Sequence, residues 1–111
     1  MPLTTATWNG KIIAESDHCI SVEGNAYFPP ESLNKAFFKD SPQTSVCHWK
    51  GNANYFDLVV DGKTNSDAAW IYNAPSPAAK AITGYVAFWK GVEVKGGENA
   101  MPLPRLVSPS A

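Results

Sequence analysis

The residues best suited to chemistry are concentrated in the middle of the chain, around the thiol of Cys47. His48 and Lys50 follow it closely. A cysteine thiolate can act as a nucleophile, and a nearby ammonium lowers its pKa. His48 is not expected to be its base, because neighbouring residues on a strand point to opposite faces. Cys47 is therefore the candidate catalytic residue, with a small buried apolar residue as the alternative.

Two adjacent pairs of metal-ligating residues occur in the chain, His18-Cys19 and Cys47-His48. Structural zinc takes four ligands in a tetrahedron, two of which commonly come from a spaced pair such as C-x-x-C. Neighbours on a strand point apart, so each adjacent pair offers only one ligand to a shared site. We therefore expect no metal and no cofactor.

Three aspartates, Asp57, Asp61 and Asp67, have the chemistry to hold Mg²⁺ for nucleotidyl transfer. Asp61 belongs to a turn, and the register derived below places Asp57 and Asp67 on opposite faces. No glycine-rich phosphate loop or G-x-S-x-G nucleophile motif is present. Asp67 is more simply a hydrogen-bond acceptor for strand ends or loop amides.

The element that must position these residues is a hairpin around Asp61-Gly62. Asp-Gly is typical of a two-residue turn, because both central residues of a type I′ turn need a positive φ. A two-residue turn fixes the register by counting. The expected opposite pairs are Val60 with Lys63, Leu58 with Asn65, Phe56 with Asp67, and Ala53 with Trp70.

Because side chains alternate along a strand, this register divides the hairpin into two faces. One face is mainly apolar and carries Phe56, Leu58, Val60, Asp67 and Ile71. The other is aromatic and polar, as pockets commonly are, and carries Tyr55, Asp57, Val59, Ser66, Trp70 and Tyr72. Cys47 and Trp49 join this second face if the strand continues through Trp49 without a bulge. The alternative is that the aromatics are all core.

Turn signals divide the remaining chain into short strands, which indicates a mainly β fold. Asn9-Gly10 predicts a first hairpin, and the three-residue link Glu23-Gly24-Asn25 predicts a second. Two short helices are expected, over residues 30–34 and over residues 77–83 with Ser76 as N-cap. A strand over residues 85–90 places Tyr85, Ala87 and Trp89 on one face, and residues 92–94 continue it.

Length and composition favour one domain over residues 1–94, followed by a loosely ordered tail over residues 95–111 rich in Gly, Pro and Ser. The net charge is −1 and the pI is about 6.0, without the basic stripe of a nucleic-acid partner. No apolar run is long enough for a membrane partner. Two cysteines are too few for a disulfide framework, so we expect a cytoplasmic protein with free thiols.

Several motifs together resemble one family, the domain of unknown function 427 family, over roughly residues 5–94. They are Tyr27-Phe28-Pro29, Cys47-His48-Trp49-Lys50-Gly51, Tyr55, Asp67-Ala68-Ala69-Trp70-Ile71-Tyr72, Pro77 and Gly84-Tyr85-Val86-Ala87-Phe88. His48 stands where the family usually has Pro. The family is also labelled nucleotidyltransferase-like, but the Gly-Ser and Asp-x-Asp signature of those enzymes is absent here.

The resemblance implies a β-tent, in which two antiparallel sheets set at an angle enclose a cleft. Similar folds occur in methionine sulfoxide reductases and in the ligand-binding domain of cereblon, whose paired C-x-x-C zinc motifs this chain lacks. The shared face of the hairpin and the family resemblance together lead us to expect an unidentified small molecule in a cleft between the sheets. The expected lining is Trp49, Tyr55, Trp70 and Tyr72, with Lys50, Asp57 and Asp67 supplying polarity. A comparison of these aromatics with the cage of cereblon is a fold-level analogy.

The alternatives are an enzyme, using either the Cys47 thiol or metal-dependent nucleotidyl transfer, and an interaction module that works as a homo-oligomer.

Overall fold

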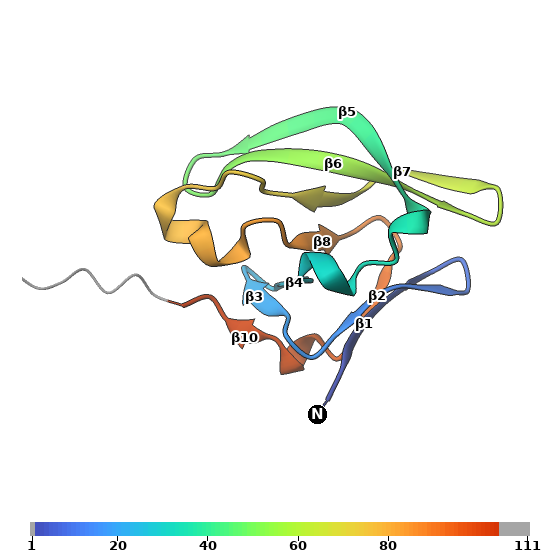
Figure 1. Ribbon diagram of the computed structural model, residues 1–111, viewed down its shortest axis with the longest axis horizontal. Coiled ribbons are helices and arrows are strands. Elements are labelled where there is room, and N and C mark those ends of the chain that lie inside the picture. Colours follow the sequence, from blue (N-terminus) through green and yellow to red (C-terminus); the bar gives the residue numbers. More distant parts are fainter. Residues whose placement is uncertain (1, 105–111) are drawn as a thin grey trace, which may run out of the picture.

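The computed structural model describes residues 2–104, which form a mainly β domain, as expected (Figure 1). The strands are β1 (Thr4–Trp8), β2 (Lys11–Ser16), β3 (Ile20–Val22), β4 (Asn25–Tyr27), β5 (Phe38–Cys47), β6 (Gly51–Val60), β7 (Lys63–Ile71), β8 (Val86–Phe88), β9 (Glu93–Lys95) and β10 (Met101–Pro102). The helices are 3₁₀ helices: η1 (Pro30–Ser32), η2 (Lys35–Phe37), η3 (Pro77–Ile82) and η4 (Gly97–Asn99). The expected two short helices are replaced by these 3₁₀ turns: η1 and η3 lie where the helices were expected, and η2 and η4 were not predicted.

The strands form three sheets, where two were expected. Their orders are β2-β1-β9, β10-β3-β4 and β5-β6-β7-β8. All the strand pairs are antiparallel except β10 with β3, which is parallel. The pairings β1–β9 and β3–β10 join opposite ends of the chain. Such long-range partners leave no local signal in the sequence, so the division into three sheets was not predicted.

The turn residues behave as their types predict. Asn9-Gly10 and Asp61-Gly62 have positive φ at both positions, 49° and 78° in the first and 50° and 77° in the second. The link between β3 and β4 is shorter than expected, because Val22 pairs directly with Asn25. Its two central residues, Glu23 and Gly24, again have positive φ. Each pair therefore forms a two-residue turn between antiparallel strands.

The expected β6–β7 register holds only near the turn. Val60 pairs with Lys63 and Leu58 with Asn65, but Phe56 then pairs with Ala69 and Tyr55 with Trp70. A bulge adds two residues to β7, and within it Asp67 has a φ of +56°. Because two is an even number, side chains beyond the bulge keep the predicted faces. The predicted pairs of Phe56 with Asp67 and of Ala53 with Trp70 are wrong.

A hairpin between β5 and β6 was missed. Strand β5 is long and runs through Pro42, with an irregularity between Ser41 and Thr44. The chain turns at His48, Trp49 and Lys50, and Cys47 pairs with Gly51. The strand that contains Tyr55 therefore does not continue back through Trp49. Gly51 has a φ of +110°, a conformation that other residues rarely adopt.

The buried side chains form two clusters that contact the four-stranded sheet. The first contains Leu58, Val60, Ala69, Ile71, Val86 and Phe88 together with residues of β1 and β2. The second contains Ala53, Tyr72 and Ala87 together with Val22 and Tyr27 of the β3–β4 hairpin and Ala79 and Ile82 of η3. Cys47, Trp49, Tyr55 and Trp70 pack against this second cluster. The alternation predicted for the hairpin and for β8 is the reason that the two clusters remain distinct.

The segment expected to be a loosely ordered tail begins with regular structure. Lys95 ends β9, and residues 97–102 contain η4 and β10, whose Met101 donates a backbone hydrogen bond to Cys19. The rest of the predicted tail, residues 105–111, lies outside the described residues.

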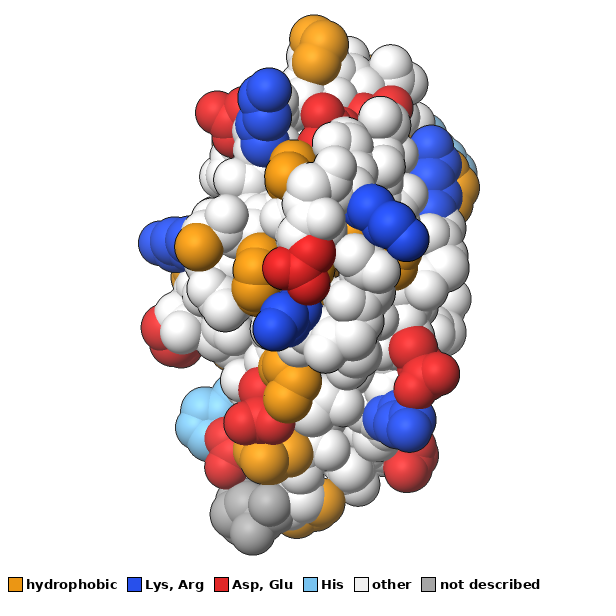
Figure 2. Space-filling view, turned by 90° about the vertical axis from the view of Figure 1, so that its right-hand side faces the viewer, with side chains coloured by type: hydrophobic (Ala, Val, Ile, Leu, Met, Phe, Trp, Pro, Cys, Tyr) orange, Lys and Arg blue, Asp and Glu red, His pale blue; other side chains and the backbone are white. Residues whose placement is uncertain are grey.

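The end of the molecule with the β1–β2 and β6–β7 turns carries acidic and basic side chains interspersed (Figure 2). None of the helices within residues 2–104 is long and apolar enough to cross a membrane.

Candidate functional site

A small pocket lies between the β3–β4 hairpin and the four-stranded sheet. Its volume is about 190 Å³, and it is lined by Asn25, Tyr27, Lys50, Tyr55, Trp70, Tyr72 and Trp89. Four of these, Lys50, Tyr55, Trp70 and Tyr72, are among the predicted ligand-binding residues. Asn25, Tyr27 and Trp89 were missed. The predicted alternation of residues 85–90 already grouped Trp89 with Tyr85 and Ala87, and this was the available signal for it.

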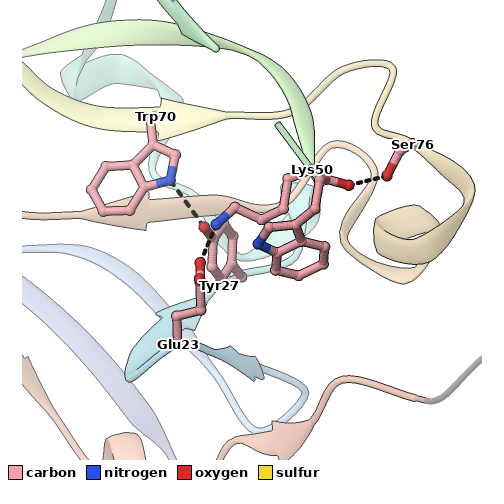
Figure 3. A network of polar contacts seen from close by, with 6 residues as sticks. Glu23, Tyr27, Lys50, Trp70 and Ser76 are labelled. Atoms are coloured by element: carbon pink, nitrogen blue, oxygen red, sulfur yellow. Dashed lines mark hydrogen bonds and ion pairs between the residues drawn. The ribbon is translucent and has the colours of Figure 1, made fainter. Parts of the chain in front are cut away.

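Three aromatic side chains form a connected wall of this pocket. Trp70 lies edge-on to Tyr27 and to Trp89, with ring centroids 6.2 Å and 5.9 Å apart. The indole Nε1 of Trp70 donates a 3.0 Å hydrogen bond to the hydroxyl of Tyr27 (Figure 3). Because Tyr27 is 1% exposed, this bond fixes both rings from the side of the core. The Tyr27 hydroxyl accepts here, so its own hydrogen remains able to donate.

Lys50 supplies the charge of the pocket. Its side chain is 8% exposed, and its ammonium forms an ion pair with Glu23 of the β3–β4 turn (Figure 3). The Nζ atom also lies 4.9 Å from the ring centroid of Trp49 and 5.7 Å from that of Tyr72. Burial lowers the pKa of Lys50, but the hydrogen bond that its ammonium donates to Glu23 and the nearby groups Tyr27, Tyr72 and Cys47 raise this pKa more. The net shift is upward, and Lys50 stays cationic.

The turn that carries Lys50 is fastened to the segment before η3. The backbone carbonyl of Lys50 accepts a 2.9 Å hydrogen bond from the N–H of Ser76. The Ser76 hydroxyl donates to the carbonyl of Trp49. Ser76 was expected to cap the following helix, but its side chain makes no cap bond because it holds this turn instead. A side chain at Gly51 would lie 3.5 Å from Pro75 and Ser76, so the two segments pack closely.

Trp49 is not one of the lining residues of the pocket. It packs against the second cluster, which includes the pocket residues Tyr27 and Tyr72, and the Lys50 ammonium lies near its ring. Trp49 therefore lies beside the pocket, whereas Trp70 and Tyr72 line it. The reason is the turn at residues 48–50, which replaces the straight strand on which the prediction depended.

Asp57 and Asp67 lie in a different hollow. It measures about 470 Å³ and is lined by Ser41, Pro42, Gln43, Asp57, Ser66 and Asp67. The Asp57 Oδ1 atom accepts a 2.8 Å hydrogen bond from the Asp67 N–H, and the Ser41 hydroxyl donates to Asp67 at 2.5 Å. The bulge brings together two carboxylates that were predicted to lie on opposite faces. Asp67 is confirmed as a hydrogen-bond acceptor that ties strands together, since its carbonyl also accepts from the Trp89 indole.

The two cysteines are free and have different surroundings. Burial raises the pKa of the Cys19 thiol to about 11. Burial also raises the pKa of Cys47, but backbone N–H donors of Trp49 and Lys50 and the Lys50 ammonium lower it more, and the net shift is downward. Cys47 is half-buried and adjoins the second cluster. Within residues 2–104, no group of three or more His, Cys, Asp or Glu side chains could hold a metal ion.

The fold and the site define a class: a small mainly β domain with an aromatic pocket that contains a buried lysine. The family model described as domain of unknown function (DUF427) matches residues 4–98, and the chain belongs to this family, as the motifs predicted. A search of curated proteins found no match.

Proposed function

We propose that this domain binds a small molecule in the pocket between β4 and the four-stranded sheet. The observation that carries the proposal is the buried Lys50 ammonium at the wall of a cavity whose other walls are mainly aromatic. Apolar walls with few placed polar groups are typical of ligand sites. A fold that needed only a core would have no reason to keep a charge there, because burying an ammonium costs several kcal/mol unless it is compensated.

Two broader features belong to the same proposal. We infer a β-tent arrangement, in which β4 and the β6–β7 pair supply opposite walls of the cleft; the support is that the lining residues come from both sides. We also infer a cytoplasmic location. Its support is that Cys19 and Cys47 are both free thiols.

Native mass spectrometry tests whether the pocket holds a ligand. The full chain is incubated with filtered cytosolic extract and measured before and after denaturation. Trp89→Ala removes a half-exposed wall of the pocket, and Val46→Ala, at a residue 78% exposed and outside the pocket, is the matched control. We expect an added mass on the native protein and on the control that is reduced several-fold in Trp89→Ala. Bare chain mass in all three samples would contradict the proposal.

Thiol chemistry at Cys47 is the second candidate function. The observation in its favour is the lowered pKa of Cys47 beside Lys50, since the thiolate is the nucleophilic form. Cys47 would then attack an electrophile bound in the adjacent pocket. Metal-dependent nucleotidyl transfer has less support, because Asp57 and Asp67 lie in another hollow and already bond to protein groups.

A further inference from the structure

Lys50 and Glu23 form an unequal ion pair. The Lys50 side chain is 8% exposed, whereas that of Glu23 is 55% exposed. Lys50 is the only charged residue among the buried ones within residues 2–104. The carbonyl of the neighbouring Trp49 accepts a hydrogen bond from the Ser76 hydroxyl, and the neighbouring Gly51 packs closely against Ser76. These contacts on both sides of Lys50 hold its ammonium in place. Glu23 belongs to a two-residue turn and reaches the ammonium from solvent, so it can leave without breaking a sheet.

The polar groups of the pocket are mainly hydrogen-bond donors. The Lys50 ammonium has three N–H groups, and Glu23 provides the ionic partner for them. The Tyr27 hydroxyl accepts from Trp70 and keeps its own hydrogen to donate. Burial raises the pKa of Tyr72 to about 12, which keeps that phenol protonated at neutral pH. Donors of this kind match an anionic oxygen group on a ligand.

The size and walls of the pocket limit the rest of the ligand. Its volume, about 190 Å³, is below the roughly 300–1,000 Å³ that is usual for drug-sized molecules. It is close to a cavity of about 150 Å³ that holds benzene. The rings of Tyr55, Trp70 and Tyr72 supply flat apolar surface for one ring.

We propose that the pocket binds a small single-ring carboxylate, whose carboxylate group takes the place of Glu23 on the Lys50 ammonium. This inference rests on the proposed function and specifies its ligand. Glu23 is then a resident counter-ion that neutralises Lys50 when the pocket is empty. It competes with the ligand, so its removal strengthens binding.

Indole N–H resonances of the ¹⁵N-labelled full chain report on this site, because the Trp70 indole lies at the pocket wall. The chain has four tryptophans, and Trp70→Phe identifies the relevant signal. Benzoate and its neutral isostere benzamide are titrated. We expect benzoate to shift the Trp70 signal and to bind at least about tenfold more tightly, since charge-assisted hydrogen bonds are stronger than neutral ones.

Glu23→Gln and the matched surface variant Glu15→Gln test the competition. Glu23→Gln should tighten benzoate binding several-fold and leave benzamide unchanged, and Glu15→Gln should change neither. Equal affinities for benzoate and benzamide, or weaker benzoate binding in Glu23→Gln, would overturn the inference while leaving small-molecule binding intact. A Trp70 signal that neither compound moves would count against the pocket as a site for single-ring ligands altogether, and with it against this inference.

Discussion

At Lys50, the effect of the charge on folding stability can be separated from its effect on ligand binding. A buried ammonium loses hydration, and the ion pair with Glu23 compensates for that loss without the packing that an apolar side chain would supply. The end of the side chain lies between rings, with Nζ 4.9 Å from the ring centroid of Trp49 and 5.7 Å from that of Tyr72, where an apolar group would also pack. A residue kept for binding should therefore be replaceable by an apolar side chain of the same length without loss of fold.

Lys50→Met tests this separation. We expect the free energy of unfolding, measured by urea titration, to stay within about 1 kcal/mol of the wild type or to rise, because a well-packed apolar side chain replaces a buried charge. The variant should lose the preference for benzoate over benzamide. A loss of more than about 2 kcal/mol would show instead that the ammonium is needed for folding.

Cys47 and Cys19 provide an internal comparison of thiol reactivity. The pKa of Cys47 is lowered from 9.0 and that of Cys19 is raised to about 11. Because the thiolate is the reacting form, iodoacetamide at neutral pH should label Cys47 first, and Cys19 only after unfolding. Peptide mapping by mass spectrometry gives the two rates.

Lys50→Met should slow the labelling of Cys47, since it removes the ammonium that stabilises the thiolate. It should leave Cys19 unchanged. Labelling of Cys47 no faster than that of an unfolded peptide would remove the support for thiol chemistry.

At the scale of elements, the bulge in β7 depends on one carboxylate. Asp57 accepts the N–H of Asp67, a residue held at a φ of +56°. Asp57→Ala leaves that N–H without its partner, and we expect the free energy of unfolding to fall by about 1–3 kcal/mol. Asp57→Asn keeps an acceptor oxygen and should lose less. Urea unfolding measures both, with Asp40→Ala on the exposed part of β5 as the control.

If Asp57→Ala and Asp40→Ala prove equally stable, Asp57 is not what holds the bulge. Its place beside Asp67 in the 470 Å³ hollow would then need another explanation.

The sequence predicted those elements whose signals are local. The turns at Asn9-Gly10 and Asp61-Gly62 and the alternation along β6, β7 and β8 depend on residues close together in the chain, and they were found. The bulge was not, because it is set by contacts of Asp67 with Ser41 and Asp57, which lie 26 and 10 residues away. The turn at residues 48–50 lacks an Asn-Gly or Asp-Gly pair, and this displaced Trp49 from its predicted face.

For the candidate site, too, the sequence predicted only the residues that are grouped by local alternation. Trp70, Tyr72 and Tyr55 were grouped correctly because an even number of inserted residues preserves the faces of β7. Tyr27 and Asn25 come from another sheet, and nothing in the sequence indicates that β4 lies opposite β7. The ion pair between Glu23 and Lys50 was not predicted either, because the two residues belong to separate hairpins that meet only in the folded protein.

For the molecule as a whole, a buried thiol and a buried phenol should make the folded state less stable at alkaline pH. Burial raises the pKa of Cys19 from 9.0 to about 11 and that of Tyr72 from 10.0 to about 12. For each group, at a pH between its ordinary pKa and its raised pKa, the unfolded chain has released a proton that the folded protein retains. The free energy of unfolding is therefore unaffected by these groups below about pH 9 and falls as the pH rises towards 12.

Urea unfolding across this range should give a midpoint that decreases steadily above pH 9. Cys19→Ala should flatten the lower part of the decrease, and Tyr72→Phe the upper part, since each removes one of the two proton-binding groups. A midpoint that stays constant up to pH 11 would contradict the prediction.

The position of β1 has a consequence for synthesis of the protein on the ribosome. β1 is the central strand of its sheet, between β2 and β9, so one of its edges lacks a partner until residues 93–95 have left the exit tunnel. A nascent chain with an open strand edge is prone to pair with other chains. Ribosome-bound chains whose residues 93–102 are still inside the tunnel should thus resist proteolysis less than chains in which a C-terminal linker has brought residue 102 outside it, where β10 has also closed on β3.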